Sequence, residues 1–159
     1  KYERETGNLL RRLGVNNSYI GFRYTIYGVI RSVHEPELLT YNPKANVEIA
    51  ARYQTSVGCV ERNIRTIINT IWLHGDRNLL NQVFGFELAQ KPRNGAFIDA
   101  LAHYVDSIIM IEEVRALLQR PSVIYQLNST VDYHVVLFRN PESSSGIRNH
   151  ALPLVRPLD

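Results

Sequence analysis

The stretch Val57–His74 reads VGCVERNIRTIINTIWLH, and its apolar residues recur at helical spacing. Because an α-helix turns by about 100° per residue, one side of this stretch collects the apolar side chains. The members of that stripe are Val60, Ile64, Ile67, Ile68 and Ile71. The opposite side carries Gly58, Arg62, Arg65, Thr66 and Asn69, and the flanks carry Cys59 and Glu61. The stretch therefore predicts an amphipathic helix with one buried face and one arginine-bearing face.

A shorter helix is expected immediately before this stretch, over residues 47–53, with Asn46 as its N-cap. Residues 54–56 then form a tight turn that caps the longer helix. The small residues Ala50 and Ala51 would let the two helices cross closely. A short helix, a tight turn and a longer helix match the helix-turn-helix plan, in which the start of the second helix contacts base edges of DNA.

The exposed face of the longer helix carries groups that suit this role. Arg62 and Arg65 lie one turn apart, and each guanidinium can form two hydrogen bonds to guanine, worth about 1–3 kcal/mol of base discrimination. Asn69 can reach a base or a phosphate, and Thr55 or Ser56 can donate to a phosphate at the helix start. A solvated surface helix shows the same pattern, so the pattern by itself leaves both interpretations open.

The rest of the chain predicts a mainly α architecture. Further helices are expected over 3–13, 20–33, 78–84 and 96–119, with Asn94 capping the last and a short turn at 37–41. Segments rich in Val, Ile and Tyr within 122–139 predict a β-hairpin, which should pack on the long helix, on another copy or on a partner. The expected domains are a helix-turn-helix bundle at 1–120 and a hairpin with an irregular tail at 121–159.

Composition is only a weak indication of a nucleic-acid partner, because arginine-rich composition also follows the base composition of the genome. The net charge is +3, and only three of the 18 cationic residues are lysines. Arginine suits forked recognition of phosphate or guanine. No apolar run approaches the roughly 20 residues of a membrane span, and Cys59 as the single cysteine excludes an internal disulfide and a cysteine-based zinc cluster. We expect a cytoplasmic, nucleoid-associated chain without cofactor, metal or small-molecule substrate, which is part of a longer protein because it begins at Lys1.

Three other features have two interpretations each. Cys59 is a redox or metal sensor, or a small half-buried side chain, and the second is favoured. His103 with Asp99 and Asp106 is a metal site or, as favoured, a surface cluster. The loop with Lys91 and Arg93 before Asn94 holds a DNA phosphate at a helix start or is a plain loop. No phosphate-binding glycine loop or nucleophile elbow is present, so an enzyme is not expected.

Several landmarks recur together in a known order and spacing between Leu9 and Val105. They are Leu13-Gly14-Val15, Ile20-Gly21-Phe22, Glu37-Leu38-Leu39, Glu48–Tyr53, Val60–Arg65, Trp72, Gly75, Phe84-Gly85-Phe86, Lys91–Asn94 and Phe97-Ile98. In these residues the chain resembles the C-terminal DNA-binding effector domain of the sporulation master response regulator of endospore-forming bacteria, the stage 0 sporulation protein A family.

The resemblance implies an all-α domain that binds short operator boxes, often as tandem copies, under the control of a phosphorylated receiver domain. Glu61, Arg62 and Arg65 match base- and backbone-reading positions of that family. Gly58 and Cys59 stand where the family usually has Ser and Arg, so one base-reading arginine is missing. A different operator or a lower affinity is therefore expected. Residues 106–159 extend beyond the family's usual end, and no receiver domain is present in this sequence.

Two functions follow as hypotheses. The first is sequence-specific double-stranded DNA binding in transcription regulation, with a recognition helix at about 56–74 and self-association on tandem sites. The expected DNA-contacting residues are Thr55, Ser56, Gly58, Cys59, Glu61, Arg62, Arg65, Thr66, Asn69, Lys91, Arg93 and Asn94. The alternative is a protein-interaction or oligomerisation module that keeps the fold but has lost specific DNA reading.

Overall fold

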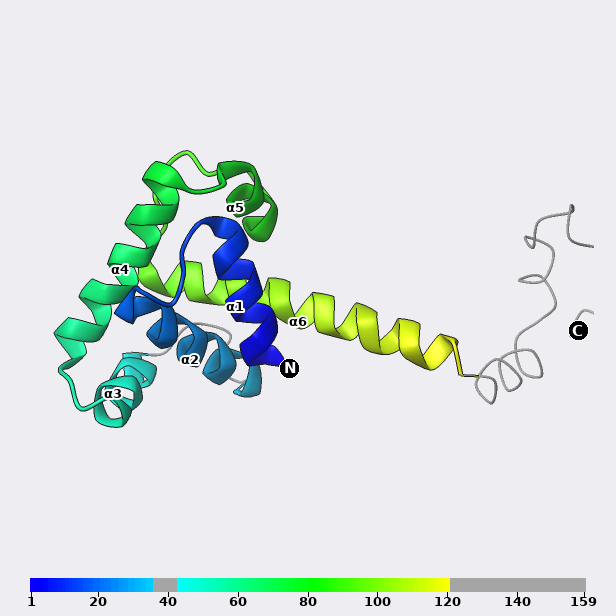
Figure 1. Cartoon of the computed structure of the whole chain (residues 1–159), viewed down its shortest axis with the longest axis horizontal. Coiled ribbons are helices and arrows are strands. Elements are labelled where there is room, and N and C mark those ends of the chain that lie inside the picture. Colours follow the sequence, from blue (N-terminus) through cyan, green and yellow to red (C-terminus); the bar gives the residue numbers. More distant parts are fainter. Residues whose placement is uncertain (36–42, 121–159) are drawn as a thin grey trace, which may run out of the picture. The chain divides into compact units, whose positions relative to one another are not determined.

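The computed structural model describes residues 1–35 and 43–120, which form helices and no strand (Figure 1). The helices are α1 (Tyr2–Leu13), α2 (Ile20–His34), α3 (Pro43–Arg52), α4 (Val57–His74), α5 (Arg77–Phe84) and α6 (Asn94–Leu118). The predicted mainly α class is confirmed for these residues. The turn expected at 37–41 and the hairpin expected at 122–139 lie outside the described residues.

The chain divides into two compact units, Lys1–Glu112 and Glu113–Asp159. The first unit contains α1 to α5 and most of α6, and the described part of the second unit is the end of α6. No helix among the described residues combines the length and apolar character that a membrane crossing needs.

Helices α3 and α4 form the predicted helix-turn-helix, with one difference at the start. Helix α3 begins at Pro43, before the expected residue, because proline lacks an N–H and is well suited to the first helical turn. Asn46 therefore lies inside α3 and is buried, so its predicted role as N-cap is wrong. The turn closes where the Thr55 N–H donates to the Ala50 carbonyl at 2.9 Å, with Gln54 at φ 52°.

Helix α4 begins and ends as the sequence predicts. Ser56 is its N-cap, and the Ser56 hydroxyl oxygen accepts a hydrogen bond from the Cys59 N–H at 3.1 Å. The helix ends at His74, and the N–H of Gly75 donates to the Ile71 carbonyl at 2.9 Å. The cap fixes the backbone of the first turn of α4.

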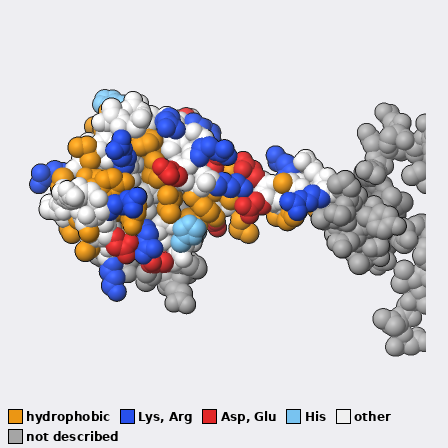
Figure 2. Space-filling model, turned by 60° about the horizontal axis from the view of Figure 1, so that its bottom comes forward, with side chains coloured by type: hydrophobic (Ala, Val, Ile, Leu, Met, Phe, Trp, Pro, Cys, Tyr) orange, Lys and Arg blue, Asp and Glu red, His pale blue; other side chains and the backbone are white. Residues whose placement is uncertain are grey.

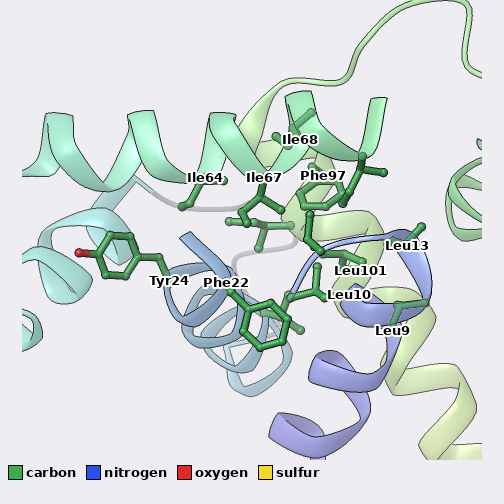
Figure 3. Close-up of a cluster of buried hydrophobic side chains, with 14 of the residues drawn as sticks. Leu9, Leu10, Leu13, Phe22, Tyr24, Ile64, Ile67, Ile68, Phe97 and Leu101 are labelled. Carbon is green, nitrogen blue, oxygen red and sulfur yellow. The ribbon is translucent and has the colours of Figure 1, made fainter. Parts of the chain in front are cut away.

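The predicted apolar stripe of α4 lies at the centre of the core. All five members, Val60, Ile64, Ile67, Ile68 and Ile71, are at most 2% exposed. They pack with side chains from α1, α2 and α6, including Leu10, Phe22, Phe97 and Leu101 (Figure 3). Burial of each such side chain contributes about 1.5–3 kcal/mol, so this face is firmly held and the opposite face points to solvent.

Helix α2 rests directly on the backbone of α4 at Gly21. A Cβ atom at this position would lie 2.2 Å from the Asn63 carbonyl oxygen, so only glycine fits. No sequence pattern marks this contact, and the close helix crossing was expected at Ala50 and Ala51 instead. Ala50 is buried, but Ala51 is exposed, so that assignment is wrong for Ala51.

The C-terminal end of α4 is held by neighbouring chain segments. The Asp76 N–H donates to the Leu13 carbonyl at 3.2 Å, and a Cβ at Gly75 would lie 2.2 Å from the same oxygen. The guanidinium of Arg77, at the start of α5, stacks over the Trp72 ring with 3.3 Å between its central carbon and the ring centroid. These contacts join the end of α1, the end of α4 and the start of α5.

Helix α6 begins at Asn94, and the Arg93 carbonyl accepts its first hydrogen bond from the Phe97 N–H at 3.0 Å. Asn94 therefore lies inside the helix, and its predicted role as N-cap is wrong. The Asn94 side-chain amide instead donates to the Glu61 carbonyl of α4 at 2.9 Å. The start of α6 is thus attached to the first half of α4.

Candidate nucleic-acid interface

The exposed face of α4 presents two guanidinium groups. Arg62 and Arg65 are both exposed, and neither guanidinium group forms a hydrogen bond or ion pair with any residue that the structure describes. Gly58, one turn earlier, is also exposed, and a Cβ added there would meet no atom within 4 Å. This part of α4 is therefore an open surface with two guanidinium groups that a ligand can reach. Figure 2 shows Lys and Arg side chains distributed over one face of the molecule.

Glu61 connects α4 to two other helices. The Asn46 side-chain amide of α3 donates to one Glu61 carboxylate oxygen at 3.3 Å, and Asn94 of α6 holds the Glu61 backbone carbonyl. The Glu61 side chain is nevertheless exposed. One carboxylate oxygen is thus used to orient the side chain, and the other is available to accept from a ligand. The sequence indicated Glu61, and it indicated Asn46 and Asn94 as helix caps and Asn94 also as a DNA contact, but it did not indicate that these asparagines hold Glu61.

Asn69 and Lys91 contact each other. The Lys91 ammonium donates to the Asn69 side-chain oxygen at 2.6 Å, which ties the loop before α6 to the second half of α4. Lys91 is exposed and Asn69 is half-buried, so the ammonium stays accessible beside the α4 face. Arg93 is exposed in the same loop. The structure brings this loop and α4 together, although they are far apart in the sequence.

The hydroxyl groups of the predicted site differ in what they can still donate. The Thr66 hydroxyl donates to the Arg62 carbonyl at 3.0 Å, so its proton is used within α4. The Ser56 oxygen accepts from the Cys59 N–H, which leaves the Ser56 hydroxyl proton for a phosphate oxygen. Ser56 is exposed, whereas Thr55 is half-buried. Ser56 is therefore the better placed donor at the start of α4.

Cys59 is a half-buried free thiol on the flank of α4. The Asn63 side-chain amide donates to the Cys59 carbonyl at 2.8 Å and lies 3.3 Å from the sulfur. No group of three His, Cys, Asp or Glu side chains within residues 1–35 and 43–120 is placed to hold a metal ion. The arrangement supports the interpretation of Cys59 as a small packed side chain.

The family comparison agrees with this geometry. Residues 6–105 match the family described as "Sporulation initiation factor Spo0A C terminal", which is more than half of the 159-residue chain. The chain belongs to this family. The resemblance inferred from the sequence is confirmed. The Spo0A C-terminal family is a family of DNA-binding effector domains of a transcription regulator and not a family of enzymes.

All of the predicted DNA-contacting residues lie within the part of the chain that matches the Spo0A C-terminal family, because the last of them is Asn94. Residues 106–159 lie beyond the match. The part of α6 after residue 105, about three and a half turns, is therefore outside the region that the family shares, although it continues the same helix.

An ion pair between α2 and α3 orients the helix-turn-helix in this member of the family. Arg31 of α2 donates two hydrogen bonds to Glu48 of α3, at 2.8 and 3.0 Å, and also pairs with Glu35. The hydrogen bond to Glu48 is the main reason that the pKa of Arg31 is raised. Such a two-pronged contact fixes direction as well as distance. No sequence signal identified it, since the two helices had to be placed first.

Tyr24 of α2 lies buried beneath the turn between α3 and α4. Its ring packs against Tyr53 with 5.0 Å between the ring centroids. Burial is the main cause that raises the pKa of the Tyr24 phenol, and the nearby Cys59 adds to it, whereas the Thr55 side chain acts in the opposite direction. The phenol therefore stays neutral at physiological pH and supports the turn by packing.

Proposed function

We propose that this chain is a sequence-specific double-stranded DNA-binding domain of a transcription regulator, and that α4 enters the major groove. The observation that carries the proposal is the pair of unpartnered, exposed guanidinium groups of Arg62 and Arg65, one turn apart. They stand on the second helix of a helix-turn-helix, opposite its buried isoleucine face. This arrangement suits contact with the O6 and N7 atoms of two guanines.

The neighbouring groups fit supporting roles around these two arginines. The exposed Glu61 carboxylate, oriented by Asn46, suits acceptance of a hydrogen bond from cytosine N4. The Ser56 hydroxyl at the start of α4 suits one phosphate, and Lys91 with Arg93 suits another. Base readout is thus assigned to the second and third turns of α4, and positioning on the DNA backbone is assigned to the start of α4 and to the loop before α6.

The first turn of α4 contributes little to base readout in this proposal. Gly58 has no side chain, and the Cys59 sulfur is next to the Asn63 amide. The arginine that the family resemblance places at this end of the helix is missing. The preferred operator should therefore differ from that of the family at the base pair under Gly58 and Cys59.

The experiment that tests the proposal is selection of binding sites from random duplex DNA, followed by mobility-shift titration of the selected duplex at several salt concentrations. A recovered consensus sequence and an affinity that falls steeply with salt are expected, because neutralised phosphates release counterions. A consensus with two copies of a short box would support binding of two protein copies to tandem sites. No shift at low salt would overturn the proposal.

The interaction-module alternative requires the face of α4 to be covered by protein. None of the residues that the structure describes covers Arg62 or Arg65. We therefore favour DNA as the partner, which would place the protein with the chromosomal DNA of the cytoplasm.

Substitution of Lys91 by alanine should weaken binding to specific and scrambled duplexes by the same factor. The reason is that an ammonium contacting a phosphate carries no base information, and its loss should reduce the salt slope of log K by about 1. Asn69→Ala is the matched control, because it removes the partner of Lys91 but keeps the positive charge. The assignment fails if K91A lowers affinity for the specific duplex alone, or if N69A reproduces the whole change in salt slope.

A further inference from the structure

Helix α6 changes its apolar face along its length. From Phe97 to Ile109 its buried residues lie on one side and complete the core of the first unit. Beyond Ile109 every residue to Arg120 is exposed. The helix nevertheless continues without interruption to Leu118. Packing in that core therefore does not account for the last turns of α6, because their side chains do not contribute to it.

The exposed end of α6 carries a second apolar strip, here called the α6 strip. It consists of Met110, Ile111, Val114, Leu117 and Leu118, which are 45–58% exposed. At about 100° per residue these five side chains fall within about 120° of one another, on the side of the helix opposite to the core face. The positions that continue the core face are Glu112, Ala116 and Gln119.

The apolar residues of α6 thus change from the core side of the helix to the opposite side, and this limits what can cover the strip. A strip that continued the core face would extend the existing core, whereas this one lies on the other side of the helix. Scattered exposed apolar residues are normal on a soluble protein, but five on one face of three turns mark an interaction surface. Figure 2 shows hydrophobic side chains next to charged ones along this part of α6.

The charges beside the strip are complementary to those of a second copy of the chain. With Val114 at heptad position a, Met110 and Leu117 take position d, and Glu113 and Arg120 take position g. In an antiparallel pair with Val114 facing Leu117 of the other copy, position g faces position g. Glu113 of each copy then lies opposite Arg120 of the other. A parallel pair would instead place these charges opposite the apolar residues at position e, such as Leu118.

We propose that the α6 strip is a self-association surface, on which two copies of this chain pair their α6 ends antiparallel about a two-fold axis. The pairing is self-complementary, since each apolar layer and each Glu113–Arg120 contact occurs twice. It lies in residues beyond the match to the family. The proposal does not depend on DNA binding, and its test uses the protein alone.

The first measurement is the mass of the full chain in solution by light scattering or sedimentation over a range of concentrations. Twice the mass of one chain is expected, with dissociation on dilution. Leu117→Glu introduces a charge into the centre of the strip and should raise the dimer dissociation constant about tenfold or more. Gln119→Glu, which adds the same charge to the opposite side of the same turn, should leave it unchanged. A single-chain mass at all concentrations, or equal effects of the two variants, would overturn the proposal.

The second measurement separates antiparallel pairing from every other cover for the strip. E113R places Arg opposite Arg, and R120E places Glu opposite Glu, so each variant alone should dimerise more weakly than the natural chain. Mixed in equal amounts they should dimerise again, because each copy then supplies the charge that the other lacks. Parallel pairing, or coverage of the strip by the chain's own residues 121–159, gives no recovery on mixing and contradicts the proposal.

Discussion

Replacement of both Arg62 and Arg65 by alanine should remove most of the preference for a specific duplex over a scrambled one. Each arginine–guanine contact is worth about 1–3 kcal/mol, which corresponds to roughly a 5- to 150-fold preference per contact. Both side chains are exposed, so neither substitution removes a buried contact. The measurement is the ratio of the two dissociation constants at one fixed salt concentration, for each single variant and for the double variant.

The matched control is the double variant R12A/R115A. Arg12 and Arg115 are exposed like the two α4 arginines, but they lie on α1 and near the end of α6. This variant loses the same total charge and should weaken binding to both duplexes by a similar, smaller factor. If R62A/R65A keeps the specificity ratio of the natural chain, base readout does not come from these residues and the proposed docking of α4 is wrong.

Gly21→Ala should destabilise the domain by about 3 kcal/mol, because a new methyl group has no space between α2 and α4. The added Cβ would lie 2.2 Å from the carbonyl oxygen of Asn63, 2.7 Å from its carbonyl carbon and 2.9 Å from Ile67 Cγ1. Two of these atoms belong to the backbone of α4, so relief requires a helix to move rather than a side chain to turn. A fall in melting temperature of about 10 °C is expected by calorimetry or circular dichroism.

Gly58→Ala is the control for this prediction. Both glycines lie in the first turn of a helix, but a Cβ at Gly58 would meet nothing within 4 Å. Alanine is also the better helix former by about 1 kcal/mol, so this variant should be as stable as the natural chain or more stable. Equal melting temperatures for the two variants would show that α2 and α4 are not in the close contact described.

The sequence was sufficient to predict helix α4, because burial of an entire face leaves a periodic signal. The isoleucine stripe of α4 and its termini at Ser56 and Gly75 are local patterns, and the structure agrees with them. The N-cap roles of Asn46 and Asn94 were also predicted from local sequence patterns, and these two predictions were wrong. Each asparagine instead holds Glu61, a contact that exists only after α3, α4 and α6 have been brought together.

The features that the sequence did not predict are mostly contacts between helices. The pairs Gly21–Asn63, Arg31–Glu48 and Lys91–Asn69 join residues that are distant in the chain, and no periodicity connects their members. The long helix α6 was predicted, but its change of face was not. Two apolar strips on opposite sides of one helix cancel when the pattern is averaged over its whole length.

The stacking of Arg77 on Trp72 makes the fold observable without a label. Trp72 is the single tryptophan of the chain, so the intrinsic fluorescence excited at the indole band comes from the last turn of α4 alone. Loss of the guanidinium from the ring face would change the emission of that one residue. Undocking of α5 from α4 can therefore be followed optically, in real time and in the unmodified protein.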